Sequence, residues 1–161
     1  METEGIFAPE TPAAARDRFA SLAPAAKTVL REVGRELSMD TGTYQEQIDD
    51  DLRLTAQESI FASLLAVRVG TRTEYEQWRE TADVGIVEVG SENVDHVVWH
   101  APPFADTAVA ATFQNEREAA VGTLRRQAFG RLYRDVVHGA GATAEDRAVQ
   151  GSETTRGGPD E

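Results

Sequence analysis

The spacing of apolar residues changes from helical to strand-like near residue 83, and this change limits the chain to a mixed fold. Before it, apolar side chains recur every three to four residues, as on one face of a helix. After it come three runs rich in β-branched residues, at 84–89, 94–101 and 108–113. The short connections between them favour an antiparallel meander. The sequence therefore predicts an α+β fold, with about five helices covering one face of a three-stranded antiparallel sheet.

Capping residues predict where the first helices begin. Thr11 followed by Pro12 is typical of an N-cap and a first helical residue, and Pro24 begins the second helix. A third helix follows the aspartates at 49–51, whose carboxylates suit the positive end of a helix dipole. We expect this helix at the centre of the core, extending past Val67 to a C-cap at Gly70. Residues 38–48 are ambiguous.

Two more helices are predicted in the second half of the chain. Thr73 and Glu76 have the spacing of a capping box, so a fourth helix begins there and carries Tyr75 and Trp78. The last helix spans 115–137, with Asn115 as its N-cap.

The globular part of the chain is predicted to be one domain at 1–138, a length sufficient for a hydrophobic core. Residues 139–161 contain five glycines, no aromatic residue, no Leu and no Ile. Such a segment buries too little apolar surface to offset the entropy lost on ordering. We therefore expect 139–161 to be a disordered acidic tail.

Composition narrows the class of protein. The chain has 28 acidic and 16 basic residues, of which only Lys27 is a lysine, and its formal charge is −12. The absence of cysteine excludes disulfides, thiolate zinc sites and a cysteine nucleophile. Because phosphate binding needs a positive field, nucleic acid is not the expected partner. Neither a leader peptide nor a membrane span is apparent, so we expect a cytoplasmic protein.

The excess of carboxylates also bears on habitat. Dense carboxylates with few ammonium groups keep a protein hydrated in molar salt, where repulsion is screened. This pattern favours an extreme halophile. An ordinary acidic protein from a GC-rich genome is the alternative, because codon bias also explains arginine in place of lysine.

Three segments resemble an uncharacterised family of haloarchaeal proteins, a domain of unknown function. These segments are Gly5 to Thr11, Gly90 to Asp95 with Trp99-His100, and Gly122 to Arg131. The resemblance covers most of 1–138 and excludes the tail. It implies no activity, ligand or catalytic residue.

The most suggestive candidate residues lie on the last predicted helix. On a helical wheel Arg125 falls within the apolar arc of Val121, Ala128 and Leu132, whereas Arg126 lies outside it. A guanidinium on the core side must find a partner. Arg125, with Arg126, could clamp an anion, or Arg125 could instead pair with an internal carboxylate.

Two histidines on the second predicted strand are candidate acid–base groups. His96 and His100 are four residues apart, so their side chains share one strand face while Trp99 lies on the other. Their Cα atoms are then about 13 Å apart, too far to grip one metal ion. We therefore predict no metal site and no cofactor, and we assign the aspartates at 49–51 to helix capping.

Known catalytic motifs are absent from the sequence. The preferred hypothesis is a non-enzymatic protein-interaction domain or accessory subunit, with a protein partner or a second copy bound through arginines and aromatics such as Tyr133 and Trp99. The alternative is a small-molecule-binding protein or enzyme acting on an anionic substrate through Arg125 and His96 or His100. The alternative predicts that Arg125, Trp99 and one histidine meet at a single pocket.

Overall fold

The computed structural model describes residues 1–139 and has the predicted α+β class. The segment predicted as a disordered tail lies outside the described residues from position 140 onward. Five helices of ten or more residues are present: α1 (Pro12–Ser21), α2 (Ala23–Glu36), α4 (Asp50–Ser63), α5 (Arg72–Thr81) and α6 (Arg117–Ala128). Three shorter helical segments join them: α3 (Thr41–Gln47), the π-helical turn η1 (Phe129–Tyr133) and α7 (Arg134–Val137).

The prediction of a three-stranded antiparallel sheet is wrong, because the sheet has five strands and is mixed. The strands are β1 (Glu2–Glu4), β2 (Val67–Thr71), β3 (Gly85–Val89), β4 (His96–His100) and β5 (Thr107–Phe113), in the order β1-β2-β4-β5-β3. The three predicted strands are all present, but β3 pairs with β5 in parallel and does not touch β4. The connection at 90–95 crosses the end of β5, where Ser91 N–H donates to Thr112 Oγ1 at 3.0 Å.

The largest error concerns the residues after α4. The helix ends at Ser63, and Val67 to Thr71 form β2. Val67 and Val69 are buried while Arg68 is exposed, which is the period of two expected for a strand. In the sequence, the apolar residues just before Val67 extend the helical pattern into this strand. Gly70 is therefore not a C-cap. The capping box likewise lies at Thr71 and Glu74, two residues before its predicted place.

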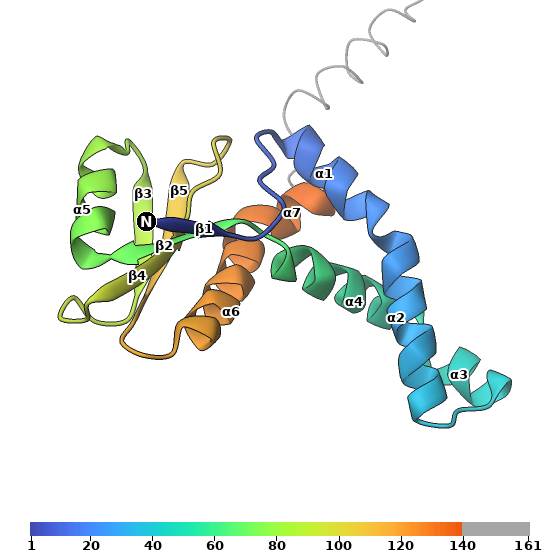
Figure 1. Ribbon diagram of the computed structural model, residues 1–161. Coiled ribbons are helices and arrows are strands. Elements are labelled where there is room, and N and C mark those ends of the chain that lie inside the picture. The colour runs from blue at the N-terminus through green and yellow to red at the C-terminus, as the bar shows by residue number, and fades with distance from the viewer. Residues whose placement is uncertain (140–161) are drawn as a thin grey trace, which may run out of the picture.

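Helices pack on both faces of the sheet, which corrects the prediction that one face is covered (Figure 1). The main core lies between the sheet and α1, α4 and α6; the predicted central helix contributes Phe61 and Ala62, its only two buried residues, and Phe61 is at the centre of the core. The Phe61 ring contacts the rings of Phe7, Phe19, Phe129 and Tyr133 at 5.4–5.9 Å. On the other face α5 covers a small aromatic cluster formed by Tyr75, Val97, Trp99 and Ala110.

The last predicted helix is interrupted. α6 begins at Arg117, without a side-chain cap, so Asn115 is not its N-cap. From Phe129 the backbone widens into the π-helical turn, which buries both Phe129 and Tyr133. Because a π turn shifts the angular position of every later residue, a wheel drawn for one continuous α-helix fails beyond Ala128.

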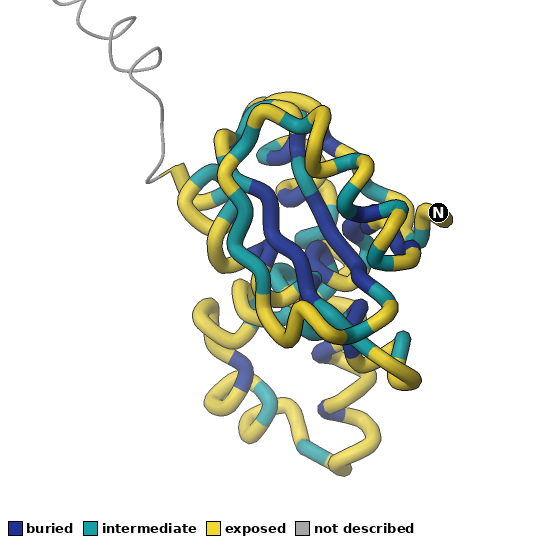
Figure 2. The backbone as a smooth tube through the Cα atoms, turned by 90° about the vertical axis from the view of Figure 1, so that its left-hand side faces the viewer, coloured by how far each residue is buried: buried dark blue, intermediate teal, exposed yellow. Residues whose placement is uncertain are grey.

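A helical arm made of α2, α3 and the first half of α4 projects from the rest of the molecule (Figure 1). Only Ala26, Leu30 and Gly34 are buried in α2, which packs mainly on α4. Figure 2 shows the arm as mostly exposed, in contrast to the buried central strands of the sheet. At its tip Tyr44 covers Gly34 so closely that an added Cβ would lie 2.7 Å from the Tyr44 ring.

Gly5 fixes the approach of β1 to the rest of the sheet. Its φ is +125°, and a Cβ there would lie 2.3 Å from the carbonyl oxygen of Leu65. We expect Gly5→Ala to lower the free energy of unfolding by about 1–3 kcal/mol, because it adds both backbone strain and a clash with main-chain atoms. Urea denaturation measures this. Gly42→Ala is the matched control, because its nearest neighbour, Asp40 Oδ1, would be 3.6 Å away. Equal losses in the two variants would contradict the assignment.

Candidate functional site

The register of the sheet places one row of side chains across three strands. Thr3 of β1 is opposite Arg68 of β2, and Arg68 is opposite Trp99 of β4. Directly opposed residues share a face and have Cβ atoms about 4.5–5.5 Å apart. A threonine, an arginine and a tryptophan side chain therefore start from neighbouring positions on the face that α5 partly covers.

This row lines a cleft of about 270 Å³. Trp78 of α5 contributes to one side, and the segments at 8–10 and 100–103 contribute to the others. Trp99 and His100, two of the residues singled out in the sequence, line the cleft, whereas Arg125 and His96 do not. Contrary to one hypothesis, Arg125 therefore does not share a pocket with Trp99 and His100. The arginine that lines this cleft is Arg68.

Three aromatic rings form the wall behind the cleft. The Trp99 ring lies 5.2 Å from Tyr75 and 5.7 Å from Trp78, measured between ring centroids. Trp99 is fully buried, and no group in residues 1–139 accepts a hydrogen bond from its Nε1. Burial, and next to it the Glu88 carboxylate, raises the pKa of Tyr75 to about 12, so its phenol is neutral at physiological pH. The wall is therefore uncharged.

Two charged side chains of opposite sign line the cleft, Arg68 and Glu10, and both are exposed. Within the described part of the chain, Arg68 makes no side-chain hydrogen bond and no ion pair. Its charge is therefore not neutralised by a contacting carboxylate.

His100 forms a buried polar pair with Tyr133. Its Nδ1 lies 2.7 Å from the Ala66 carbonyl oxygen, and its Nε2 lies 2.6 Å from the Tyr133 hydroxyl. Because a carbonyl only accepts, Nδ1 carries the proton, and Nε2 accepts from the Tyr133 O–H. Burial is the main cause that lowers the pKa of His100 to about 4, and burial also raises the pKa of Tyr133. Both groups are neutral near pH 7, and both ring nitrogens are engaged.

His96 shares a face with His100, as predicted, but has a different environment. Its ring stacks on Phe113 at 5.3 Å, at the far end of β4. Its Nδ1 is buried and has no hydrogen-bond partner among residues 1–139. The two histidines thus do not act on a common ligand.

Arg125 binds main-chain carbonyls in place of the internal carboxylate or free anion that the sequence suggested. Its Nε donates to Leu65 O at 3.0 Å, and its Nη2 donates to Glu4 O at 3.2 Å. Arg126 is exposed, and its one side-chain hydrogen bond within residues 1–139 is to Thr123 Oγ1. Trp99 and Tyr133 are fully buried, which leaves neither ring available as an interface anchor in this conformation.

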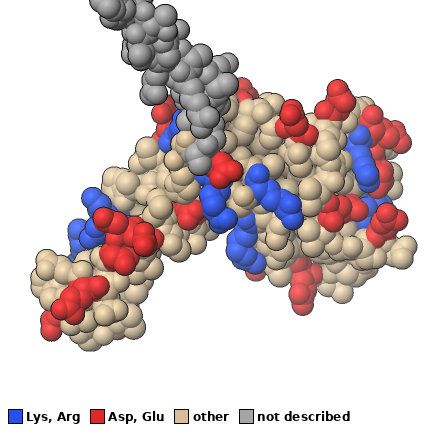
Figure 3. Space-filling view, turned by 180° about the vertical axis from the view of Figure 1, so that it is seen from behind, with Lys and Arg blue, Asp and Glu red and all other residues tan. Residues whose placement is uncertain are grey.

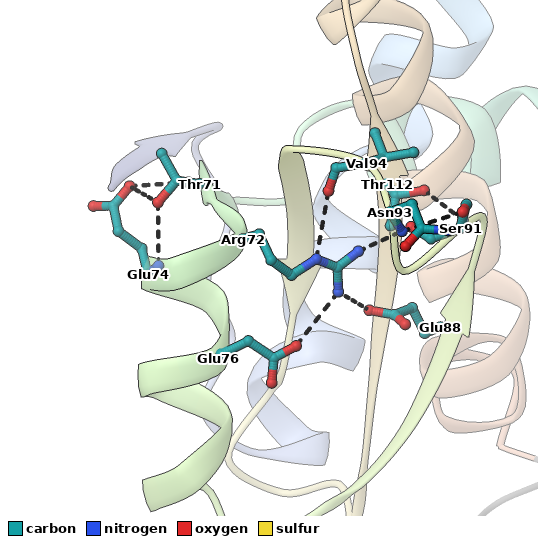
Figure 4. A network of polar contacts seen from close by, with 9 residues as sticks. All are labelled: Thr71, Arg72, Glu74, Glu76, Glu88, Ser91, Asn93, Val94 and Thr112. Carbon is teal, nitrogen blue, oxygen red and sulfur yellow. Dashed lines mark hydrogen bonds and ion pairs between the residues drawn. The ribbon is translucent and has the colours of Figure 1, made fainter.

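Arg72 forms a second polar network, which the sequence did not indicate (Figure 4). Its guanidinium donates to Glu88 at 3.1 Å, to Glu76 at 3.4 Å and to the carbonyl oxygens of Ser91 and Val94. The four acceptors come from α5, β3 and the loop before β4, so the network holds this loop against α5. With its donors engaged, Arg72 has a structural role.

A model of the family of unknown function DUF5809 matches residues 6–134. The chain belongs to this family. The DUF5809 match excludes the C-terminal segment, as the resemblance seen in the sequence does. No curated protein and no solved structure matches the chain significantly. The family therefore brings no activity to this chain.

Two further features of the DUF5809 domain concern metals and membranes. No group of three or more histidine, aspartate or glutamate side chains in residues 1–139 is placed to hold a metal ion. Over the same residues, no helix is both long and apolar enough to cross a membrane.

Sequence reasoning missed Arg68, Trp78 and Thr3 as parts of one site. The alternation of Val67, Arg68 and Val69 is the signal that could have placed Arg68 on a strand. Thr3 carried no such signal, because a three-residue edge strand has too few positions to show a period.

The pKa of His100 makes the stability of this domain depend on pH. A folded pKa of about 4 against an unfolded value of 6.5 means that the unfolded chain binds more protons between these limits. The stabilisation is complete above pH 6.5 and decreases by about 3 kcal/mol as the pH falls to about 4. Urea denaturation at pH 7 and pH 5 measures how much the free energy of unfolding changes with pH. This pH range lies above the one in which carboxylates titrate.

The decrease in stability from pH 7 to pH 5 should disappear in His100→Asn and remain in His138→Gln. His138 is the control because its ring is at the surface, where it contacts Glu58. An unchanged decrease in His100→Asn would show that another group is responsible.

Proposed function

We propose that this chain is a non-enzymatic protein-interaction domain or accessory subunit whose partner binds the helical arm. One observation supports the proposal. Val29, Val33 and Leu37 form an apolar stripe along α2, and their exposed fractions are 46%, 42% and 63%. We call these three residues the α2 stripe.

The α2 stripe has the geometry of a helix-docking surface. Its residues are spaced i, i+4 and i+8, so they lie in one row beside the buried positions Ala26, Leu30 and Gly34 of the same helix. Single exposed apolar residues are common on protein surfaces. A continuous row on a projecting helix is the feature that amphipathic partner helices recognise. Because each side chain is already about half buried, covering the exposed part would contribute about half of the ~1.5–3 kcal/mol that full burial gives.

The charge of the arm indicates what kind of partner fits. Residues 23–56 contain seven acidic and four basic side chains, a net charge of −3. Figure 3 shows acidic side chains at the tip and along the side of the arm. Glu32 and Glu36 follow the uncovered edge of the α2 stripe, so a partner helix with an apolar face and a basic flank is complementary. A second copy of the chain would bring its own acidic flank to the same place.

The test compares two variants of α2. The full chain is used to capture partners from native lysate in molar KCl, and captured proteins are identified by mass spectrometry. Val33→Asp should lose a discrete partner that wild type and Thr28→Asp retain, because Thr28 is an exposed residue on another face of the same helix. The partner's basic amphipathic helix, made as a peptide, should then bind purified wild type and not Val33→Asp.

Light scattering on the purified protein measures its oligomeric state, which distinguishes a separate partner from a second copy of the chain. A dimer that Val33→Asp dissociates would assign the α2 stripe to a second copy. A monomer with identical capture by all three proteins would overturn the proposal.

We further propose that the protein functions in the cytoplasm of an extreme halophile, the haloarchaeal origin that the sequence resemblance implies. The charge of −12 and the single lysine support this origin. Most ion pairs of the described residues involve exposed side chains, as in Arg35–Glu32 and Arg53–Asp50, and such pairs contribute little. The surplus of carboxylates is therefore a net repulsion that salt must screen.

Salt should accordingly stabilise the fold. Lowering KCl from about 1 M to about 0.1 M lengthens the Debye length from about 3 Å to about 10 Å and exposes the carboxylates to mutual repulsion. We expect the melting temperature of the purified chain to fall in this titration, measured by circular dichroism. A melting temperature that does not change with KCl would contradict a halophilic origin.

The alternative function, ligand binding through Arg125 and His96 or His100, is supported less well. Arg125 is engaged by two carbonyls and His100 by Ala66 and Tyr133. The observation that favours a ligand is the cleft beside Arg68, on a different part of the molecule from the arm.

A further inference from the structure

The cleft beside Arg68 has several features of a ligand-binding site. The first is a row of hydrogen-bond donors that the strand register aligns. Thr3, Arg68 and Trp99 occupy consecutive strands in one row, and all three line the cleft. Each carries a hydrogen-bond donor. Three neighbouring side chains with hydrogen-bond donors, one of them cationic, suit the oxygens of a bound carboxylate better than they suit a neutral group.

Arg68 differs from the other arginines near the sheet. Arg72, Arg117 and Arg125 all donate to carboxylates or main-chain carbonyls of this chain. Arg68 donates to none of the groups in residues 1–139. In a chain with 12 more acidic than basic residues, an arginine with no contacting carboxylate is free to bind an anionic ligand.

The indole N–H of Trp99 is a second, independent observation. Trp99 is fully buried and lines the cleft, and its Nε1 has no acceptor in the described part of the chain. Buried donors are nearly always hydrogen-bonded, because an unmade bond costs about 1–3 kcal/mol. A ligand oxygen entering between Arg68 and Trp99 would supply the missing acceptor.

The rest of the lining indicates that the ligand also carries a positive charge. Glu10 places a carboxylate at the same cleft, and the partly exposed Trp78 offers an indole face. A carboxylate and an indole together favour an ammonium group, through charge attraction and a cation–π contact. Pro102 and Pro103 complete the lining with apolar surface. The volume of about 270 Å³ is below the range of about 300–1,000 Å³ typical for drug-sized ligands, so the ligand is compact.

We propose that this cleft binds a small zwitterion, an α-amino acid or a betaine. The ligand carboxylate pairs with Arg68 and accepts from Thr3 and Trp99. Its ammonium or quaternary ammonium group lies toward Glu10 and Trp78.

Tryptophan fluorescence tests the proposal directly, because the chain has two tryptophans and both line the cleft. The full-length protein in molar KCl is titrated with glycine betaine and with L-valine. Acetate and choline serve as probes that carry only one of the two charges. We expect a saturable change in emission with at least one zwitterion, and affinity at least about tenfold weaker for acetate and choline.

Saturation by glycine betaine alone would assign the cationic subsite to a quaternary ammonium. Saturation by L-valine alone would assign it to an ammonium that donates to Glu10. Emission that does not saturate with either zwitterion would overturn the proposal, and so would equal affinity for acetate, which would indicate a simple anion site.

Variants separate the two charged contacts. Arg68→Gln should weaken zwitterion binding by about tenfold or more, since it removes a charge-assisted hydrogen bond. Glu10→Gln should reduce the affinity for the zwitterion toward that for acetate. Arg131→Gln is the matched control, because Arg131 does not line the cleft and, within the described residues, donates only to Gln127. Both test residues are exposed, and thermal melts of the variants verify that they fold. Unchanged affinity in Arg68→Gln would overturn the proposal.

Discussion

Three consecutive carbonyl groups, at Leu64, Leu65 and Ala66, join the end of α4 to the N-terminal segment, to α6 and to β4. Leu64 O accepts from the amides of Ile6 and Phe7, Leu65 O from Arg125, and Ala66 O from His100. This turn follows the last helix of the arm and precedes β2 in the sheet. Its carbonyls cannot be satisfied within a helix or strand, so segments far away in the chain satisfy them. The positions of β1, α6 and β4 depend on these contacts.

Local signals were sufficient to predict much of the helical half. Thr11 and Asp49 cap the helices that follow them, and Phe61 is the centre of the core. The shared face of His96 and His100 also followed from the period of a strand. These features depend on neighbours within a few residues, where spacing determines geometry.

The remaining features depend on partners that a single sequence does not reveal. The pairing of β3 with β5 is set by a crossing connection whose amide at Ser91 is held by Thr112, 21 residues away. Arg125 was recognised as a cation on the core side of its helix. Its acceptors are main-chain oxygens, which every residue has, so no side-chain pattern indicates them. The cleft was missed for a related reason, because Thr3, Arg68 and Trp99 become neighbours only when strands from three parts of the chain align.

The hydrogen bonds that Arg125 donates to Leu65 O and Glu4 O also affect the order of folding. The second bond joins Glu4 to a residue 121 positions later, whereas the contacts between α2 and α4 in the arm join residues no more than 40 positions apart. Contacts between distant residues form late, because closing a long loop costs entropy before any contact is gained. On the ribosome, β1 is made first, but the contact that Arg125 makes with Glu4 forms only after α6 has emerged. The first strand to be made therefore gains its last tertiary contact only near the end of synthesis.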